Sequence, residues 1–196
     1  MVLTLLIAVS AIVVPLLSNL TIGLGDIQMS PEQIATETTM QMVRRAILGD
    51  NGQKGLWQDL GEQDSYLPQS MADLFVLSSS APPLLQFYDP NVKLGWRGPY
   101  LLSSGAQYGT PFGAGVASST YGQPADPAVL DGWGRPIVIQ YPSSPVTEPD
   151  RSTYVRLVSA GENGIIDTPL NKTLPALSEC KDDIVLYLRV PDTRPR

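Results

Sequence analysis

The first 25 residues, Met1 to Gly25, contain no charged side chain, and this feature constrains the chain more than any other. Most positions from Val2 to Leu17 are Val, Leu, Ile or Ala. As an α-helix, such a segment reaches about 37 Å, which is enough to cross a hydrocarbon core of about 30 Å. Pro15 is compatible with a spanning helix, because neighbouring helices can satisfy the carbonyl group that a proline frees. We therefore expect residues 1–25 to form a transmembrane helix and residues 26–196 to form one globular domain.

A cleaved secretory signal peptide is the alternative for this segment, since small residues such as Ala8, Ser10 and Ala11 are present. A signal peptide has a shorter apolar stretch and a basic region before it, whereas the first Lys or Arg of this chain is Arg44. The length of the stretch favours a membrane anchor. The missing positive charge also leads us to expect that the true N-terminus lies upstream of Met1.

The charge and the rare residue types exclude several classes of function. The net charge is −6 and the cations are scattered, so we expect no nucleic-acid partner. Cys180 is the only cysteine and there is no histidine, which excludes an internal disulfide, a histidine base and the usual zinc sites. We expect a protein that is not an enzyme. An anchored hydrolase using Ser159 with Asp167 or Asp183 is an alternative, but no nucleophile elbow supports it.

The globular domain is predicted to begin with a second helix. Ser30 and Pro31 supply an N-cap and a proline at the first helical position, and Gln33 completes a capping box. Apolar residues then recur at helical spacing up to a turn at residues 49–52, so this helix has one apolar face to bury. A shorter helix is predicted around residues 69–77. The predicted apolar face of the second helix consists of Ile34, Met40, Val43, Ile47 and Leu48.

The remaining chain predicts loops and a small sheet. Residues 81–149 are rich in Pro, Gly, Ser and aromatic residues, which indicates an ordered region without long helices. Three apolar runs with β-branched or aromatic residues, at 136–141, 154–159 and 184–189, predict strands. We expect a small antiparallel sheet that covers the apolar face of the second helix. The predicted fold class is therefore α+β, with a pilin-like N-terminal helix protruding from a loop-rich domain.

The order of these elements resembles a known family. An apolar N-terminal helix, an amphipathic helix, GWRGPYL at 95–101, DGWGRP at 131–136 and a final pair of strands together look like the G-type major pseudopilin of type II secretion systems. Val13-Val14-Pro15 resembles the valine-valine-proline inside the membrane helix of that family. This chain shows neither the basic leader nor the phenylalanine and glutamate of the family's mature terminus. Either its start is misassigned or clipped, so that Met1 lies inside the mature helix, or it is a divergent member that a prepilin peptidase cannot process. We prefer the first, because the apolar segment itself is intact.

The resemblance implies a structural function rather than a catalytic one. A pseudopilin is a single-pass protein of the bacterial inner membrane, with its globular domain in the periplasm, before it assembles into a pseudopilus. The implied partners are membrane lipid, like subunits in a homopolymer, minor pseudopilins and the inner-membrane assembly platform. Arg97 and Arg135 are expected either to pair with acids of adjacent subunits or to remain solvated. The implied activity is support for the export of folded proteins.

The resemblance also implies a structural calcium ion in the last loop, at residues 161–183. Calcium takes six to eight oxygen ligands, and carboxylate and amide oxygens bracket this loop. Asp183 matches the family's aspartate before the last strand, and Asn163 stands where the family has an aspartate in its turn. The alternative is an ordinary polar turn with the acids in solvent. The candidate metal ligands are Asp183, Asn163, Asp182, Asp167 and Glu162.

A different class of function is also open, namely a type IV pilin or minor pilin that acts as an adhesive or binding subunit. Its recognition surface would consist of Tyr88, Trp96, Tyr100 and Trp133. In a loop-rich domain, however, tryptophan more often pins loops to the core. We therefore expect Trp96 and Trp133 to be core residues.

Overall fold

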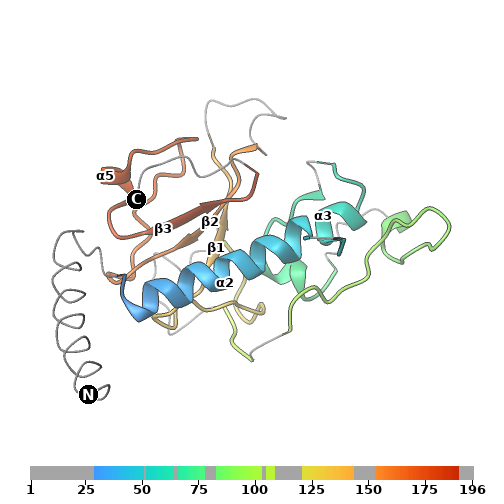
Figure 1. Ribbon diagram of the computed structural model, residues 1–196, viewed down its shortest axis with the longest axis horizontal. Helices are drawn as coiled ribbons and strands as arrows, with labels where there is room; N and C mark the ends of the chain where they lie inside the picture. Colours follow the sequence, from blue (N-terminus) through green and yellow to red (C-terminus); the bar gives the residue numbers. More distant parts are fainter. Residues whose placement is uncertain are drawn as a thin grey trace, which may run out of the picture. The chain divides into compact units, whose positions relative to one another are not determined.

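A computed structural model describes the globular domain (Figure 1). The chain divides into two compact units, Met1–Ser30 and Pro31–Arg196, and the second of these is treated below. The predicted transmembrane helix at 1–25 lies outside the described residues. No helix among the residues described is long and apolar enough to cross a membrane. The described residues are 29–50, 52–63, 66–77, 83–102, 105–108, 121–143 and 153–189.

The predicted second helix is confirmed as α2, Pro31–Leu48. Its buried residues follow the spacing i, i+4, i+7 and i+11, which places them on one face of the helix. The helix ends before Gly49, whose φ of +87° lies in the left-handed region that favours glycine. The Gly49 N–H donates to the Arg45 carbonyl at 2.7 Å and closes the last turn. The buried residues are Thr36, Met40, Val43 and Ile47.

One predicted member of the apolar face is wrong, because Ile34 is 53% exposed. Thr36, two positions along the helix, is fully buried instead. Its hydroxyl donates to the Glu32 carbonyl at 2.8 Å and accepts the Gly132 N–H at 2.9 Å, so the polar side chain is satisfied in the interior. A Cβ atom on Gly132 would lie 2.2 Å from the Glu32 carbonyl oxygen. Glycine at this position therefore allows the DGWGRP turn to pack against α2.

The three predicted strands are confirmed, each within its predicted range. β1, Val138–Gln140, β2, Arg156–Ser159, and β3, Ile184–Tyr187, form an antiparallel sheet in the order β1-β2-β3. Val158 is the partner of Val138 on one side and of Val185 on the other. The domain is therefore α+β, as predicted, with β2 in the centre of the sheet.

Both faces of the sheet are covered. Successive side chains of a strand point to opposite faces. Ile139 and Leu157 join a large core cluster with α2, whereas Val138 and Val158 join a smaller cluster with Tyr108. Figure 1 shows α2 beside β3, and the Arg44 side chain donates from α2 to the Leu188 carbonyl just after β3 at 2.8 Å. The large cluster comprises Met40, Val43, Ile47, Leu56, Leu60, Leu67, Met71, Leu74, Phe75, Ile137, Ile139, Val155, Leu157 and Leu188.

The short helices differ from the prediction. In place of a helix over 69–77, the structure has a 3₁₀ turn, η2, Met71–Leu74, and the Asp73 carboxylate accepts the Ser70 N–H at 3.1 Å. A single turn of this kind is too short to show helical periodicity in sequence. Three further short elements were not predicted for the same reason. They are α3, Leu56–Asp59, η3, Pro83–Leu85, and α5, Leu177–Cys180.

Candidate functional site

The loop between β2 and β3 brings the side chains of three of the five predicted ligand residues into contact. Asn163 lies among them, and its amide Nδ2 donates to Asp182 at 2.5 Å and to Asp167 at 2.9 Å. The Asn163 main-chain N–H donates to the second Asp182 oxygen at 2.7 Å. The Asn163 Oδ1 accepts the Ile165 N–H at 2.6 Å. Glu162 is exposed in the same turn.

Asp183 holds the far end of this loop. Its Oδ2 accepts three hydrogen bonds, from the Asp167 N–H at 2.8 Å, the Thr168 N–H at 2.6 Å and the Thr168 hydroxyl at 2.7 Å. Its Oδ1 is buried and accepts no hydrogen bond within the described part of the chain. Burial outweighs the hydrogen bonds and raises the pKa of Asp183 to about 6. The Asp183 charge is therefore poorly compensated.

Two of the chain's own cations already occupy the loop. The Lys181 ammonium group donates to Asp167 Oδ1 at 2.6 Å, and this hydrogen bond lowers the pKa of Asp167. Arg135, from the DGWGRP turn, donates to the Gly161 carbonyl. Its guanidinium lies so close to Gly164 that a Cβ atom there would be 3.0 Å from it. Arg135 thus binds a carbonyl of its own chain, and its side chain is partly buried instead of fully solvated.

The donor chemistry of the loop fits calcium, but the arrangement fits it only in part. The buried Oδ1 of Asp183 is a carboxylate oxygen without a donor, which is what a cation needs. The oxygens of Asp167, Asp182 and Asn163 accept hydrogen bonds from Lys181 and from the loop itself. No group of three or more acid, cysteine or histidine side chains converges as a metal site within the described residues. Asp183, Asp182 and Asp167 would hold an ion only if the loop brought their carboxylates together and Lys181 left Asp167.

The raised pKa of Asp183 predicts a pH-dependent stability. In the folded protein this carboxyl binds its proton more tightly than in the unfolded chain, where the ordinary pKa is 3.8. Its contribution to stability is therefore fully present below pH 3.8 and is lost as the pH rises through about 6. We expect Asp183→Asn to remove this loss. Melting temperatures measured between pH 4 and pH 7 will check it, and parallel curves for the two proteins would contradict it.

Arg156, which sequence reasoning missed, fixes the second half of the same loop. This residue of β2 is fully buried, and within the described chain it forms no ion pair with a carboxylate. Its terminal nitrogens donate to the carbonyls of Pro169 at 2.8 Å, Lys172 at 3.0 Å and Thr173 at 3.1 Å. Its Nε donates to the Gln140 side chain at 2.6 Å. The guanidinium therefore binds the loop chiefly through main-chain carbonyls.

A signal for this arginine is present in the sequence. Arg156 stands in the apolar run Val155-Arg156-Leu157-Val158. If both faces of such a strand are covered, none of its side chains reaches solvent. A charged residue in such a run must find buried partners, because an isolated buried charge costs many kilocalories per mole. The Tyr187 ring lies 5.9 Å from the guanidinium, and its hydroxyl donates to the Thr173 carbonyl at 2.9 Å. The buried cation and its neighbours form one polar network.

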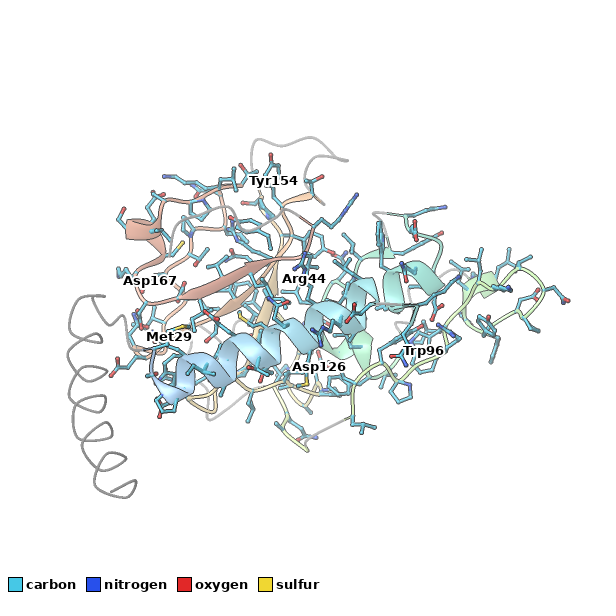
Figure 2. All side chains as sticks on the ribbon, in the orientation of Figure 1. Met29, Arg44, Trp96, Asp126, Tyr154 and Asp167 are labelled. Carbon is cyan, nitrogen blue, oxygen red and sulfur yellow. The ribbon has the colours of Figure 1, made fainter. Side chains whose placement is uncertain are left out.

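The four aromatic residues proposed as a recognition surface do not form one. Trp96 and Tyr100 are partly buried against the large core cluster, in a T-shaped pair 6.3 Å apart. Trp96 therefore packs against the core, as expected, whereas the same expectation is wrong for Trp133, which belongs to neither core cluster of the described residues. Tyr88 is exposed beside Arg97, and Trp133 is partly exposed in the DGWGRP turn. Figure 2 shows Trp96 and Asp167 toward opposite ends of α2.

In the hydrolase alternative, the Ser159 hydroxyl would be paired with Asp167 or Asp183, but it donates to a different acid. The Ser159 side chain is fully buried, and its hydroxyl donates to Asp131 Oδ2 at 2.6 Å. Asp167 and Asp183 instead bind Lys181 and Thr168. Ser159 therefore serves the packing of the DGWGRP turn against β2.

Comparisons with family models, with curated proteins and with solved structures found no match for this chain.

Proposed function

We propose that this chain is a structural subunit of a type II secretion pseudopilus, held in the inner membrane by residues 1–25 before assembly. The observation that supports this most is the order of the parts. An uncharged segment long enough for a bilayer comes first, and α2 follows it with one face buried on a three-stranded antiparallel sheet. A helix placed in this way can continue a filament core into a globular outer domain.

The mechanism of such a subunit is assembly. The apolar segment moves from lipid into a bundle of identical helices, so its apolar surface remains out of water throughout. The globular domains then meet through heterologous contacts, which generate an open helical filament instead of a closed ring. The solvent-facing side of α2 carries Ile34 and Met42, which are 53% and 52% exposed. These two apolar side chains are available for contact with a neighbouring subunit.

Cross-linking through these two positions tests the proposal. Cys180 is buried, so Ile34→Cys/Met42→Cys gives the full chain two accessible thiols. We expect oxidation to give a ladder of covalent oligomers in membranes of cells that carry the secretion apparatus. The ladder should vanish when residues 1–25 are deleted. Monomers alone in the presence of the apparatus would contradict the proposal, and the unsubstituted chain controls for Cys180.

A calcium-dependent last loop belongs to the same proposal. Because Lys181 and calcium would compete for Asp167, we expect calcium to raise the melting temperature more in Lys181→Gln than in the unsubstituted chain. Asp183→Ala should abolish the rise in both backgrounds. The measurement is thermal melting of the full chain with calcium and with a chelator. Equal melting temperatures in all conditions would mean that the loop acids bind no calcium and are ordinary turn residues.

An adhesive type IV pilin or minor pilin is the second candidate, and one observation favours it. Leu84, Phe87 and Val92, here called the apolar lobe, are 91%, 80% and 63% exposed. The lobe is held in place, because the Trp96 N–H donates to the Leu85 carbonyl at 2.9 Å. Exposed apolar side chains gathered on an ordered segment are typical of binding surfaces. Neighbouring genes for pilus retraction would favour this candidate, whereas genes for a secretion ATPase and outer-membrane channel would favour the pseudopilus.

A further inference from the structure

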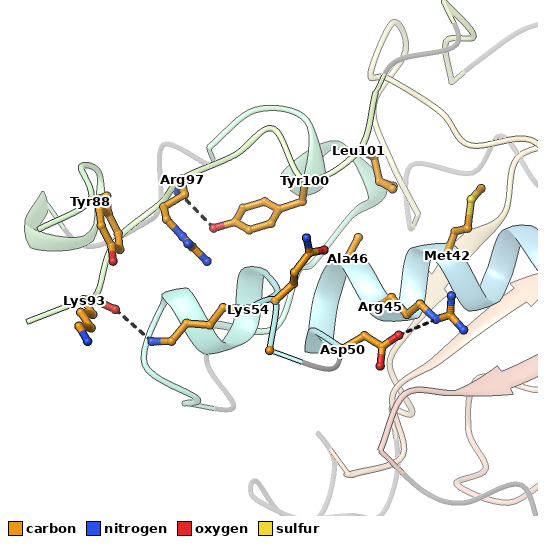
Figure 3. Close-up of a pocket in the computed structure, with 12 residues that line it drawn as sticks. Met42, Arg45, Ala46, Asp50, Lys54, Tyr88, Lys93, Arg97, Tyr100 and Leu101 are labelled. Carbon is orange, nitrogen blue, oxygen red and sulfur yellow. Dashed lines mark hydrogen bonds and ion pairs between the residues drawn. The ribbon is translucent and has the colours of Figure 1, made fainter. Parts of the chain in front are cut away.

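A pocket of about 940 Å³ lies beside the C-terminal end of α2 (Figure 3). Its walls come from three parts of the chain: the last turns of α2, the turn that follows, and the segment 88–101. Figure 2 shows this end of the domain, marked by Trp96, to be the one away from Asp167. The pocket is therefore separate from the last loop. Its lining residues are Met42, Arg45, Ala46, Asp50, Gly52, Gln53, Lys54, Tyr88, Lys93, Arg97, Tyr100 and Leu101.

The pocket is basic in an acidic chain. Four cations line it, Arg45, Lys54, Lys93 and Arg97, together with one acid, Asp50. The whole chain carries a net charge of −6. A hollow lined by charges of one sign focuses the electric field and concentrates counter-ions. The local field at this pocket therefore attracts anions, against the charge of the molecule as a whole.

Arg97 is held in position by a buried carboxylate. Its Nε donates to Asp59 Oδ2 at 2.7 Å, and the Asp59 side chain is fully buried. The Tyr100 hydroxyl donates to the same oxygen at 2.8 Å, while the Tyr88 ring lies 5.3 Å from the guanidinium carbon. Figure 3 shows the guanidinium between these two rings. Its terminal nitrogens have no acceptor within the described chain and are therefore available to a ligand.

The other three cations have weak partners or none among the described residues. The Lys54 ammonium donates to the Lys93 main-chain carbonyl at 3.2 Å, a neutral acceptor. Lys93 itself has a φ of +54°, in the left-handed region, and is one of the residues that line the pocket. Arg45 pairs with Asp50 at 3.3 Å, but both side chains are exposed, and exposed pairs contribute little. These ammonium and guanidinium groups therefore retain most of their capacity to bind an anion.

From these contacts we infer that the pocket binds a compact, multiply charged oxyanion, such as an oligophosphate or a small polycarboxylate. Pockets of roughly 300–1,000 Å³ hold small-molecule ligands. The planar fork of Arg97 matches two oxygens of one phosphate or carboxylate group, and the lysines supply point charges for the next group. The gathering of four cations in one pocket favours a compact ligand over an extended acidic peptide. The inference does not depend on the proposed function.

Calorimetric titration of the full chain, kept in solution with a non-ionic detergent at low salt, tests this site. The probes are tripolyphosphate and citrate, which separate a phosphate from a carboxylate ligand, and we expect saturable binding of at least one of them. Lys54→Ala/Lys93→Ala should weaken that binding by about tenfold or more, and Arg97→Lys, which keeps the charge but loses the fork, by about tenfold. Lys172→Ala, which removes an exposed lysine that pairs with Glu179, should leave it unchanged.

Three results would overturn the inference. The first is no binding of either probe, and the second is binding that Lys54→Ala/Lys93→Ala leaves unaltered. The third is binding of a hexaglutamate peptide without binding of either compact anion, which would assign the pocket to an acidic peptide segment instead. Both lysines are exposed, so the double variant should keep the melting temperature of the unsubstituted chain. Arg97→Lys provides a second, independent measurement at the same site.

Discussion

Arg156→Met is expected to destabilise the domain by about 4 kcal/mol, because it removes the donors of several buried hydrogen bonds together. Methionine fills a similar volume, so packing is largely retained while the carbonyls of Pro169, Lys172 and Thr173 lose their donor. Each buried acceptor left unsatisfied costs about 1–3 kcal/mol. For a domain of this size, the loss corresponds to a fall in melting temperature of about 10 °C.

Arg45→Met is the matched control for this change. Arg45 is two-thirds exposed and forms one surface ion pair with Asp50, which contributes at most about 1 kcal/mol. Denaturant unfolding of both variants separates a buried hydrogen-bond network from a general effect of losing an arginine. Similar midpoints for Arg156→Met and Arg45→Met would mean that the loop carbonyls find water when the guanidinium is removed.

Asp131→Ala is expected to cost about 3 kcal/mol, the second largest effect. Asp131 Oδ1 accepts the N–H groups of Trp133 and Arg135, both at 2.9 Å, and its Oδ2 accepts the Ser159 hydroxyl at 2.6 Å. The carboxylate therefore holds the DGWGRP turn in shape and fastens it to β2. Without it, the buried Ser159 hydroxyl loses the acceptor to which it donates.

Asp126→Ala provides the comparison, since the Asp126 carboxylate accepts one hydrogen bond within the described chain, from the Gln123 N–H at 2.7 Å, in an exposed turn. We expect it to cost less than about 1 kcal/mol. Thermal and denaturant unfolding report both variants. If Asp131→Ala costs no more than Asp126→Ala, the turn is held by its packing against α2, through Gly132 and Thr36, and not by the carboxylate.

The parts of the fold that could be predicted are those with a local signal. The strands around Ile139, Leu157 and Val185 are runs of β-branched and aliphatic residues, and such runs favour pairing wherever they lie. The end of α2 at Gly49 was predicted because glycine adopts the left-handed conformation there at little cost. The error at Ile34 is one of helical phase, because a residue six positions before Met40 points about 120° away from the buried face, whereas Thr36, four positions before it, lies on that face. What the sequence does not show is the partner of the buried Thr36 hydroxyl, the Gly132 N–H, which is 96 residues away.

The candidate sites likewise include one that has a local signal in the sequence and one that has none. Asn163, Asp167 and Asp182 could be predicted to meet, because a loop between adjacent antiparallel strands must return to its start. The basic pocket could not be predicted. Its cations, at positions 45, 54, 93 and 97, are not consecutive in the sequence. They come together only because three separate segments pack against one another. Asp59, which positions Arg97, comes from a helix of a single turn that showed no periodicity.

The contact between Arg44 and Leu188 also fixes an order of events during synthesis. The two residues are 144 positions apart, and they join α2, the first described helix, to the last described strand. A ribosome therefore completes the apolar face of α2 long before β3, the strand beside it, has emerged. During that interval Met40, Val43 and Ile47 have no native strand to cover them, so the nascent chain exposes an apolar face that favours aggregation. Closure of the domain is consequently a late event that depends on nearly the whole described chain being present.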